Sequence, residues 1–176
     1  MVPALAATSL FVLLVALYAG GARDVYEAII RGWGVEPFSF PFLDTDTVLS
    51  AIRCLRKGVD VFVVNPCDYL SRVYDYSPLW LTLAAFPMTL GWLQPIGFGL
   101  DVAFLASLLL LPAGRIRRDV ALIAFGVVSS ATVYAVERGN NDLVIFILAA
   151  GAATLAGRSP ALRIVGYLLA LLAGLL

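Results

Sequence analysis

The sequence contains no histidine, only two cysteines and no excess of either charge. The lack of histidine excludes imidazole bases, histidine-dependent nucleophile triads and the commonest protein ligand of transition metals. Any proton transfer must therefore use carboxylates or tyrosines. Because 12 Lys and Arg side chains balance 12 Asp and Glu side chains, the chain has no net field that would attract nucleic acid. We expect no nucleic-acid partner.

The common phosphate-binding loops of soluble enzymes are also missing. The sequence has no P-loop, and Gly97-Phe98-Gly99 lacks both the third glycine and the preceding strand of a dinucleotide-binding turn. We therefore expect no soluble nucleotide as a donor substrate.

Apolar residues dominate the chain instead. They make up 61% of the 176 residues, charged residues make up 14%, and the mean hydropathy is +0.94. Soluble domains are about 45–50% apolar and about 25% charged, so this composition excludes a soluble globular enzyme and predicts a single all-α integral membrane domain. A transmembrane helix needs about 17–25 apolar residues. We expect about five such helices, at 3–21, 96–111, 120–136, 143–156 and, incompletely, 164–176.

Two short arginine-rich loops, at 114–118 and 158–163, predict the orientation. The positive-inside rule places both loops in the cytoplasm, so residues 22–77 and 137–142 are expected on the extracytoplasmic side of a cell membrane. A further apolar run at 78–93 then cannot cross as well. We interpret this run as a re-entrant or interfacial helix, because proline and glycine residues interrupt it.

The two ends of the chain carry further expectations. Residues 19–22 are small, as at a signal-peptide cleavage site, but the chain start lacks the basic residues of a signal peptide. We therefore expect an uncleaved first span. The last apolar run, 164–176, is short for a span, so we expect the chain to be the N-terminal portion of a longer protein.

The polar segment 22–77 carries 14 of the 24 charged side chains. Within it, apolar residues at 48, 49, 52 and 55 form one stripe of a helix. This pattern predicts an amphipathic juxtamembrane helix lying on the membrane, with Asp44, Thr45 or Asp46 as its N-cap, Gly58 at its C-terminus and extended chain at 59–64. A carboxylate held there could accept a proton from a substrate hydroxyl. Ordinary N-capping is the alternative explanation for both aspartates.

A second polar cluster, 65–81, lies just before the chain returns to the apolar runs. Arg72 could bind a phosphate in a bidentate fork, and Tyr74, Tyr76 and Trp80 could stack on a sugar. Alternatively, the aromatic residues form an interfacial belt and Arg72 pairs with Asp68 or Asp75.

The segment 137–142 joins two predicted spans on the same side as 22–77. It contains three charges and two amides, more than a hairpin turn requires. We therefore expect the two polar segments to meet and to form one site. The candidate binding residues in this hairpin are Glu137, Arg138, Asn140, Asn141 and Asp142.

Two further features leave alternatives open. Asp101 lies inside an apolar run, where a charge costs about 2.5–3.5 kcal/mol, so it must face protein or a cavity. It could serve a substrate path or pair with another helix. Cys54 and Cys67 both lie in the segment expected in an oxidising compartment, which permits one disulfide.

In its order of features the sequence resembles the N-terminal part of a GT-C class membrane glycosyltransferase. The features are the first span, the Asp-led helix, Gly58-Val59-Asp60-Val61-Phe62, the segment 72–81 with Tyr-Ser-Pro-Leu-Trp, and Glu137-Arg138-Gly139-Asn140-Asn141-Asp142. The resemblance covers about 43–146 and is closest to glycosyltransferase family 87, the polyprenyl-phosphate-mannose-dependent α-mannosyltransferase-like group.

This resemblance implies an inverting transfer of a hexosyl group, such as mannosyl, from a polyprenyl-phosphate donor to a hydroxyl of a lipid or glycan acceptor. It implies a general base in the first loop, which fits Asp46, our preferred residue, or Asp44. It also implies that Arg138, Asn140 and Asn141 bind phosphate or sugar. No cofactor is expected, although the two aspartates could hold a divalent cation.

Two other functions fit the sequence. A non-catalytic truncated membrane module, such as a lipid-binding scaffold or an assembly partner, would explain the apparent truncation. A small transporter would explain Asp101, but the sequence lacks the repeated broken spans of such proteins.

Overall fold

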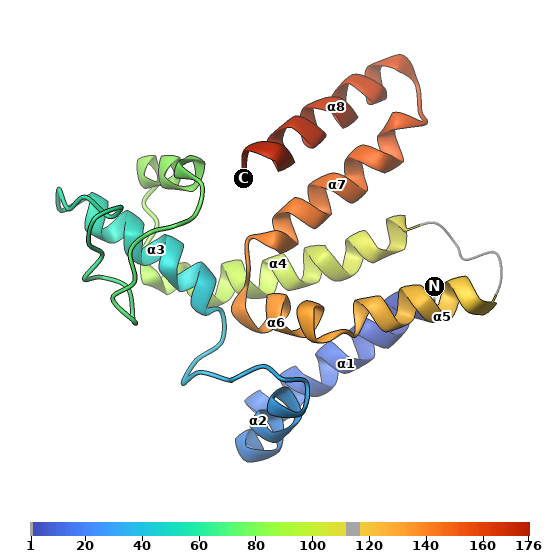
Figure 1. Cartoon of the computed structure of the whole chain (residues 1–176), viewed down its shortest axis with the longest axis horizontal. Coiled ribbons are helices and arrows are strands. Elements are labelled where there is room, and N and C mark those ends of the chain that lie inside the picture. The colour runs from blue at the N-terminus through green and yellow to red at the C-terminus, as the bar shows by residue number, and fades with distance from the viewer. Residues whose placement is uncertain (1, 112–116) are drawn as a thin grey trace.

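The computed structural model describes residues 2–111 and 117–176, and this part of the chain is helical without strands. Figure 1 shows its elements. In chain order they are α1 (Val2–Ala19), α2 (Arg23–Gly32), α3 (Leu43–Leu55), η1 (Pro78–Ala85), η2 (Leu90–Trp92), α4 (Leu93–Ser107), η3 (Leu108–Leu110), α5 (Arg117–Val127), α6 (Ser130–Arg138), α7 (Asp142–Ala156) and α8 (Pro160–Leu175). The predicted all-α fold is confirmed for these residues.

Two helical stretches are long and apolar enough to cross a membrane, namely Leu90–Leu110 with 21 residues and Arg117–Arg138 with 22 residues. Three further apolar helices, Pro3–Ala19, Asp142–Ala156 and Pro160–Leu175, are shorter. Each of the five predicted spans therefore lies in a helical stretch of the described chain. Residues 114–116 of the predicted arginine loop lie outside the described residues.

The predicted span 120–136 is not one continuous helix. It bends at Val128 and Ser129, where α5 ends and the Ser129 side chain accepts a hydrogen bond from the Thr132 amide to cap α6. The indole nitrogen of Trp33 donates to the Val128 carbonyl at 2.8 Å, and the Thr132 hydroxyl donates to Gly126 at 3.0 Å. These side-chain bonds are made to backbone carbonyl groups at the bend, where the regular helical hydrogen bonds are interrupted.

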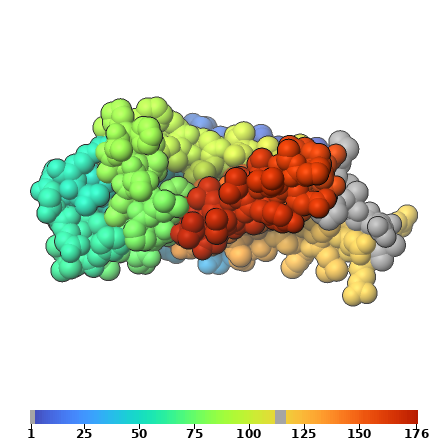
Figure 2. Space-filling view, turned by 90° about the horizontal axis from the view of Figure 1, so that it is seen from above, coloured from blue at the N-terminus to red at the C-terminus, as the bar shows by residue number. Residues whose placement is uncertain are grey.

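The run 78–93 is broken, as the sequence predicts, but it forms no α-helix of its own. It begins as the 3₁₀ helix η1 after a Ser77 cap, and its second part leads through η2 directly into α4. Ser77 donates to the Leu175 carbonyl at the end of α8, at 2.8 Å. Figure 2 shows α8 along one face of the elongated molecule, with part of this segment at its end.

The segment 22–77 holds more helix than predicted, because α2 precedes α3. Tyr26 and Ile30 of α2 are buried against Leu14 of α1 and Val133 of α6. The prediction of extended chain at 59–64 is also wrong. The amides of Val63 and Val64 donate to the Asp60 carbonyl, which closes a turn.

Helix α3 lies where it was expected, but it is not a surface helix. Residues 43–52 are all buried, because the chain at 61–81 packs on one side and α4, α6 and the 137–142 hairpin lie on the other. Neither aspartate caps the helix. Its N-cap is Phe42, in the left-handed region with φ 69°, and no side chain accepts a cap hydrogen bond there. The predicted C-terminal Gly58 is confirmed, with φ 78°.

A disulfide between Cys54 and Cys67 ties the end of α3 to the following loop, with a Cα–Cα distance of 5.8 Å. Beside it, Val48, Ile52, Val61 and Tyr74 form a small buried core. The permitted disulfide is thus present, and it fixes the chain that carries Asp68 and Arg72 against α3.

Candidate functional site

The start of α3 and the 137–142 hairpin meet, as the sequence predicts. The Phe42 amide donates to the Glu137 carbonyl at 2.8 Å, and the Thr45 hydroxyl donates to the Gly139 carbonyl at 2.8 Å. Gly139 ends α6 with φ 57°, and a Cβ there would lie 2.5 Å from the Thr45 hydroxyl oxygen. Only glycine tolerates both the backbone conformation and this close approach.

Asp44 is the carboxylate that faces the hairpin. Its Oδ2 accepts a hydrogen bond from Asn140 Nδ2 at 2.7 Å. The amide of Asn140 is itself oriented, because its Oδ1 accepts from the Asp142 backbone amide at 2.8 Å. Burial raises the pKa of Asp44, and the Asn140 hydrogen bond and the Arg72 charge offset part of that rise. A raised pKa brings a carboxylate closer to the range that suits a general base.

Arg72 lies beside Asp44 but is held by Asp68. Its Nε and Nη2 donate to the two oxygens of Asp68 at 3.2 and 3.1 Å, which confirms one of the two predicted pairings. Its Nη1 is 3.9 Å from Asp44 Oδ1, too far for a hydrogen bond. With 37% of its side chain exposed, Arg72 keeps a cationic edge beside Asp44 that can receive an anion.

Asp68 anchors this arginine and was not expected to have so many partners. It accepts hydrogen bonds from Thr47 at 2.9 Å and from the Leu70 amide at 2.9 Å, besides those from Arg72. Burial works to raise the pKa of Asp68, but the hydrogen bonds outweigh it and the pKa is lowered. Asp68 therefore stays ionised and fixes Arg72. Nothing in the sequence distinguishes Thr45 and Thr47, which join these elements, from other threonines.

Asp46 faces away from the hairpin. Its Oδ2 accepts from Ser50 at 3.4 Å, and both burial and the nearby Asp68 charge raise its pKa. Asp44 and Asp46 are two positions apart, so they project about 200° apart around the helix axis. Within the described residues, no group of three or more Cys, Asp and Glu side chains could hold a metal ion.

The predicted aromatic residues separate into different environments. Tyr76 lies near enough to Asp44 for its hydroxyl to lower the pKa of that carboxyl. Tyr74 is 2% exposed and packs against Phe62 in the core beside α3, so it offers no face for stacking. Trp80 lines a small cavity together with Asn141, and the indole nitrogen of Trp80 and the amide nitrogen of Asn141 both lack partners there.

The charged residues of the hairpin also lie in different environments. Arg138 Nε lies 2.9 Å from Glu137 Oε2, an ion pair whose direction does not suit a hydrogen bond. Arg138 also donates to the Glu36 carbonyl at 2.8 Å and stacks 4.0 Å above the Phe38 ring. Asp142 is exposed. The site that the structure assembles is therefore Asp44, Arg72, Tyr76 and Asn140, with Arg138 behind it.

Comparisons with protein families, with curated proteins and with solved structures find no match to this chain.

Proposed function

We propose that the protein is a multi-pass membrane glycosyltransferase of GT-C type, which transfers a hexosyl group from a polyprenyl-phosphate donor to an acceptor hydroxyl. The observation that carries this proposal is the buried Asp44 carboxylate, oriented by Asn140 and flanked by Arg72 at 3.9 Å. A proton acceptor beside a cation is what such a transfer requires, because the reaction moves a proton at one end and releases a phosphate at the other.

Asp44 is the general base in this mechanism. It takes the proton from the acceptor hydroxyl, whose oxygen bonds to the anomeric carbon. The bond from that carbon to the phosphate oxygen breaks on the opposite face of the sugar, so the configuration inverts. The electron pair leaves on the polyprenyl phosphate. We prefer Asp44 to Asp46 because only Asp44 contacts the hairpin.

Arg72 stabilises the departing phosphate. Arg138, which the family resemblance favours, is 6% exposed and is already engaged by Glu137, Glu36 and Phe38. Arg72 is more accessible, and Asp68 holds its guanidinium in place. Asp68 and Thr47 take the Nε and Nη2 donors of Arg72, so its Nη1 would bind the phosphate oxygen. Because it is more exposed than Arg138, Arg72 is the better phosphate ligand.

A membrane location is supported by the two long apolar helices and by the outward faces of the other helices. Large apolar side chains are exposed along the molecule, among them Leu5, Val102, Phe125, Leu168 and Leu171. Exposed apolar surface of this extent is typical of contact with lipid or with another protein. The contact between Asp44 and Asn140 supports a location of both segments on one side of the membrane, and the positive-inside rule predicts that this side is extracytoplasmic.

The test compares Asp44→Asn and Asp46→Asn in the full-length protein, reconstituted with a radiolabelled polyprenyl-phosphate hexose. Asp44→Asn should lower the transfer rate by about 10²–10⁴-fold, the usual contribution of a general base. Asp46→Asn should lower it by less than about tenfold, because the partners of Asp46 are Ser50 and the Tyr69 backbone and not the hairpin. Asp75→Asn, at an exposed position, controls for the loss of a negative charge.

Full activity of Asp44→Asn would refute the assignment of the base. Binding of the labelled donor without transfer by the unchanged protein would favour a non-catalytic lipid-binding module.

A further inference from the structure

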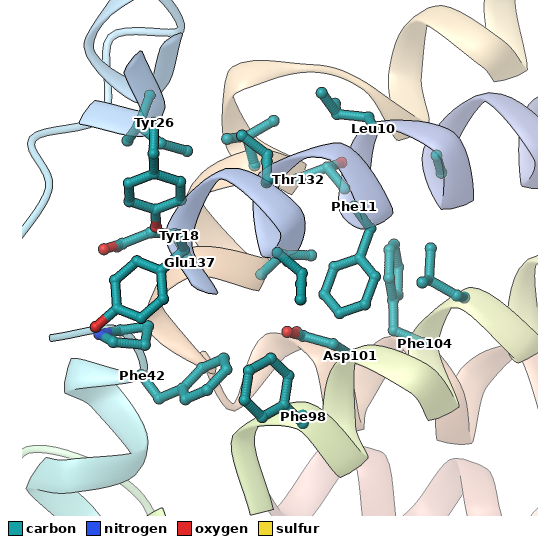
Figure 3. A pocket seen from close by; sticks show the side chains of 18 of the residues that line it. Leu10, Phe11, Tyr18, Tyr26, Phe42, Phe98, Asp101, Phe104, Thr132 and Glu137 are labelled. Atoms are coloured by element: carbon teal, nitrogen blue, oxygen red, sulfur yellow. The ribbon is translucent and has the colours of Figure 1, made fainter. Parts of the chain in front are cut away.

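A second cavity lies between α1, α4 and the bent α5–α6 pair, and Tyr26 and Ile30 of α2 close one end of it. Its volume is about 70 Å³, several times the roughly 10–15 Å³ that one water molecule needs. Figure 3 shows this space and the side chains around it. None of Asp44, Arg72 and Asn140 lines it, so it is separate from the proposed transfer site.

The cavity wall is aromatic and acidic. Among the described residues, two with carboxyl groups line it, Asp101 and Glu137, and no lysine or arginine does. Six aromatic residues complete much of the wall: Phe11, Tyr18, Tyr26, Phe42, Phe98 and Phe104. Aromatic faces carry partial negative charge and attract cations. The composition of the wall therefore matches a positively charged, largely apolar molecule.

Asp101 is the most deeply buried carboxyl group of this cavity wall. It is 1% exposed, and its Oδ1 has no hydrogen-bond partner in the part of the chain that the structure describes. Figure 3 shows its carboxyl group pointing into the space between Phe11 and Phe98. A buried carboxylate without a donor or a cation is costly, and such residues mark functional positions in apolar helices.

Within residues 2–111 and 117–176 no basic side chain pairs with Asp101, and the two arginines that contact residues of the cavity wall are engaged elsewhere. Arg138 pairs with Glu137 at 2.9 Å. Arg23 lies over the Tyr18 ring at 5.2 Å and pairs with Glu27 at 3.3 Å. Since Glu137 pairs with Arg138, Asp101 is the carboxyl group of the cavity wall that has no basic partner among the described residues.

We propose that this cavity binds a monovalent organic cation, an ammonium group on an aliphatic chain. The ammonium donates a hydrogen bond to Asp101 Oδ1, and its chain packs against the aromatic wall. Neither the Asp44 site nor glycosyl transfer is needed for this binding, so the proposal is independent of the proposed function.

The test is calorimetric titration of the protein, in nanodiscs of zwitterionic lipid, with three probes of equal chain length: hexylammonium, 1-hexanol and hexanoate. Hexylammonium should bind at least about tenfold more tightly than 1-hexanol, since hydrogen bonds to charged groups are the stronger class. Hexanoate should bind most weakly. Asp101→Asn should remove the preference for hexylammonium, and the exposed Asp75→Asn should keep it.

Equal binding of hexylammonium and 1-hexanol to the unchanged protein would overturn the proposal, and so would the absence of binding by any probe. This comparison needs no variant, so it decides the question even if Asp101→Asn fails to fold. An unchanged preference in a folded Asp101→Asn protein would also overturn it.

Discussion

Replacing Gly139 by alanine should separate the start of α3 from the hairpin that carries Asn140. The added Cβ would lie 2.5 Å from the Thr45 hydroxyl oxygen and 3.2 Å from the Phe42 Cβ. Real Cβ atoms do not approach so closely, so the Thr45 hydrogen bond to the Gly139 carbonyl must break. The left-handed backbone, with φ 57°, adds a further cost for any residue other than glycine.

The expected loss is about 2–3 kcal/mol of unfolding free energy. About 1–2 kcal/mol of it comes from the left-handed conformation and about 1 kcal/mol from the lost hydrogen bond. In a Thr45→Ala background the closest contact is absent and the hydrogen bond is already gone. The double variant should therefore lose about 1 kcal/mol less unfolding free energy than the two single variants lose together.

Chemical denaturation of the detergent-solubilised protein, followed by circular dichroism, measures these free energies. Gly157→Ala is the matched control, because Gly157 also ends a helix, has no positive φ and has no atom within 4 Å of an added Cβ. It should stay within about 0.5 kcal/mol of the unchanged protein. Strict additivity of Gly139→Ala and Thr45→Ala, or a Gly139→Ala cost as small as that of the control, would refute the contact between α3 and the hairpin.

Two further predictions concern the site and its support. Asn140→Leu removes a hydrogen bond that lowers the pKa of Asp44. Because the base must be deprotonated, the acidic limb of the pH–rate profile for transfer should move to higher pH. An unmoved limb would contradict the role of Asp44. Replacing Cys54 and Cys67 by serine removes a disulfide with a sequence separation of 13, which should lower the free energy of unfolding by about 3 kcal/mol through loop entropy. Denaturation with and without reductant measures this loss, and equal midpoints would contradict the prediction.

The relation between the two polar segments was predictable because it depends on topology. The sequence predicts two spans between 22–77 and 137–142, which would leave both segments on one side of a membrane, and the structure brings Asp44 and Asn140 into contact. The assignment to a glycosyltransferase family stays a prediction, because it depends on short motifs.

The elements that the sequence did not predict depend on contacts between distant residues. Helix α2 was missed although its apolar residues form one helical stripe, which buries Tyr26 and Ile30 against α1 and α6. At the bend between α5 and α6, Trp33, which lies 95 residues before Val128, donates to its carbonyl. The Trp33 contact leaves no local pattern in the sequence.

Composition and periodicity by themselves determined that the chain is helical and apolar, where its five long apolar runs and α3 lie, and that two acidic residues open α3. Composition and periodicity report on each segment by itself and carry no information on its neighbours in the fold. Only the tertiary structure decided that α3 is buried and that Asp44, not Asp46, meets Asn140. The physical reason is rotation: which side of a helix faces a given neighbour is set by packing with remote residues, here Gly139 and Tyr74, and no local repeat encodes that angle.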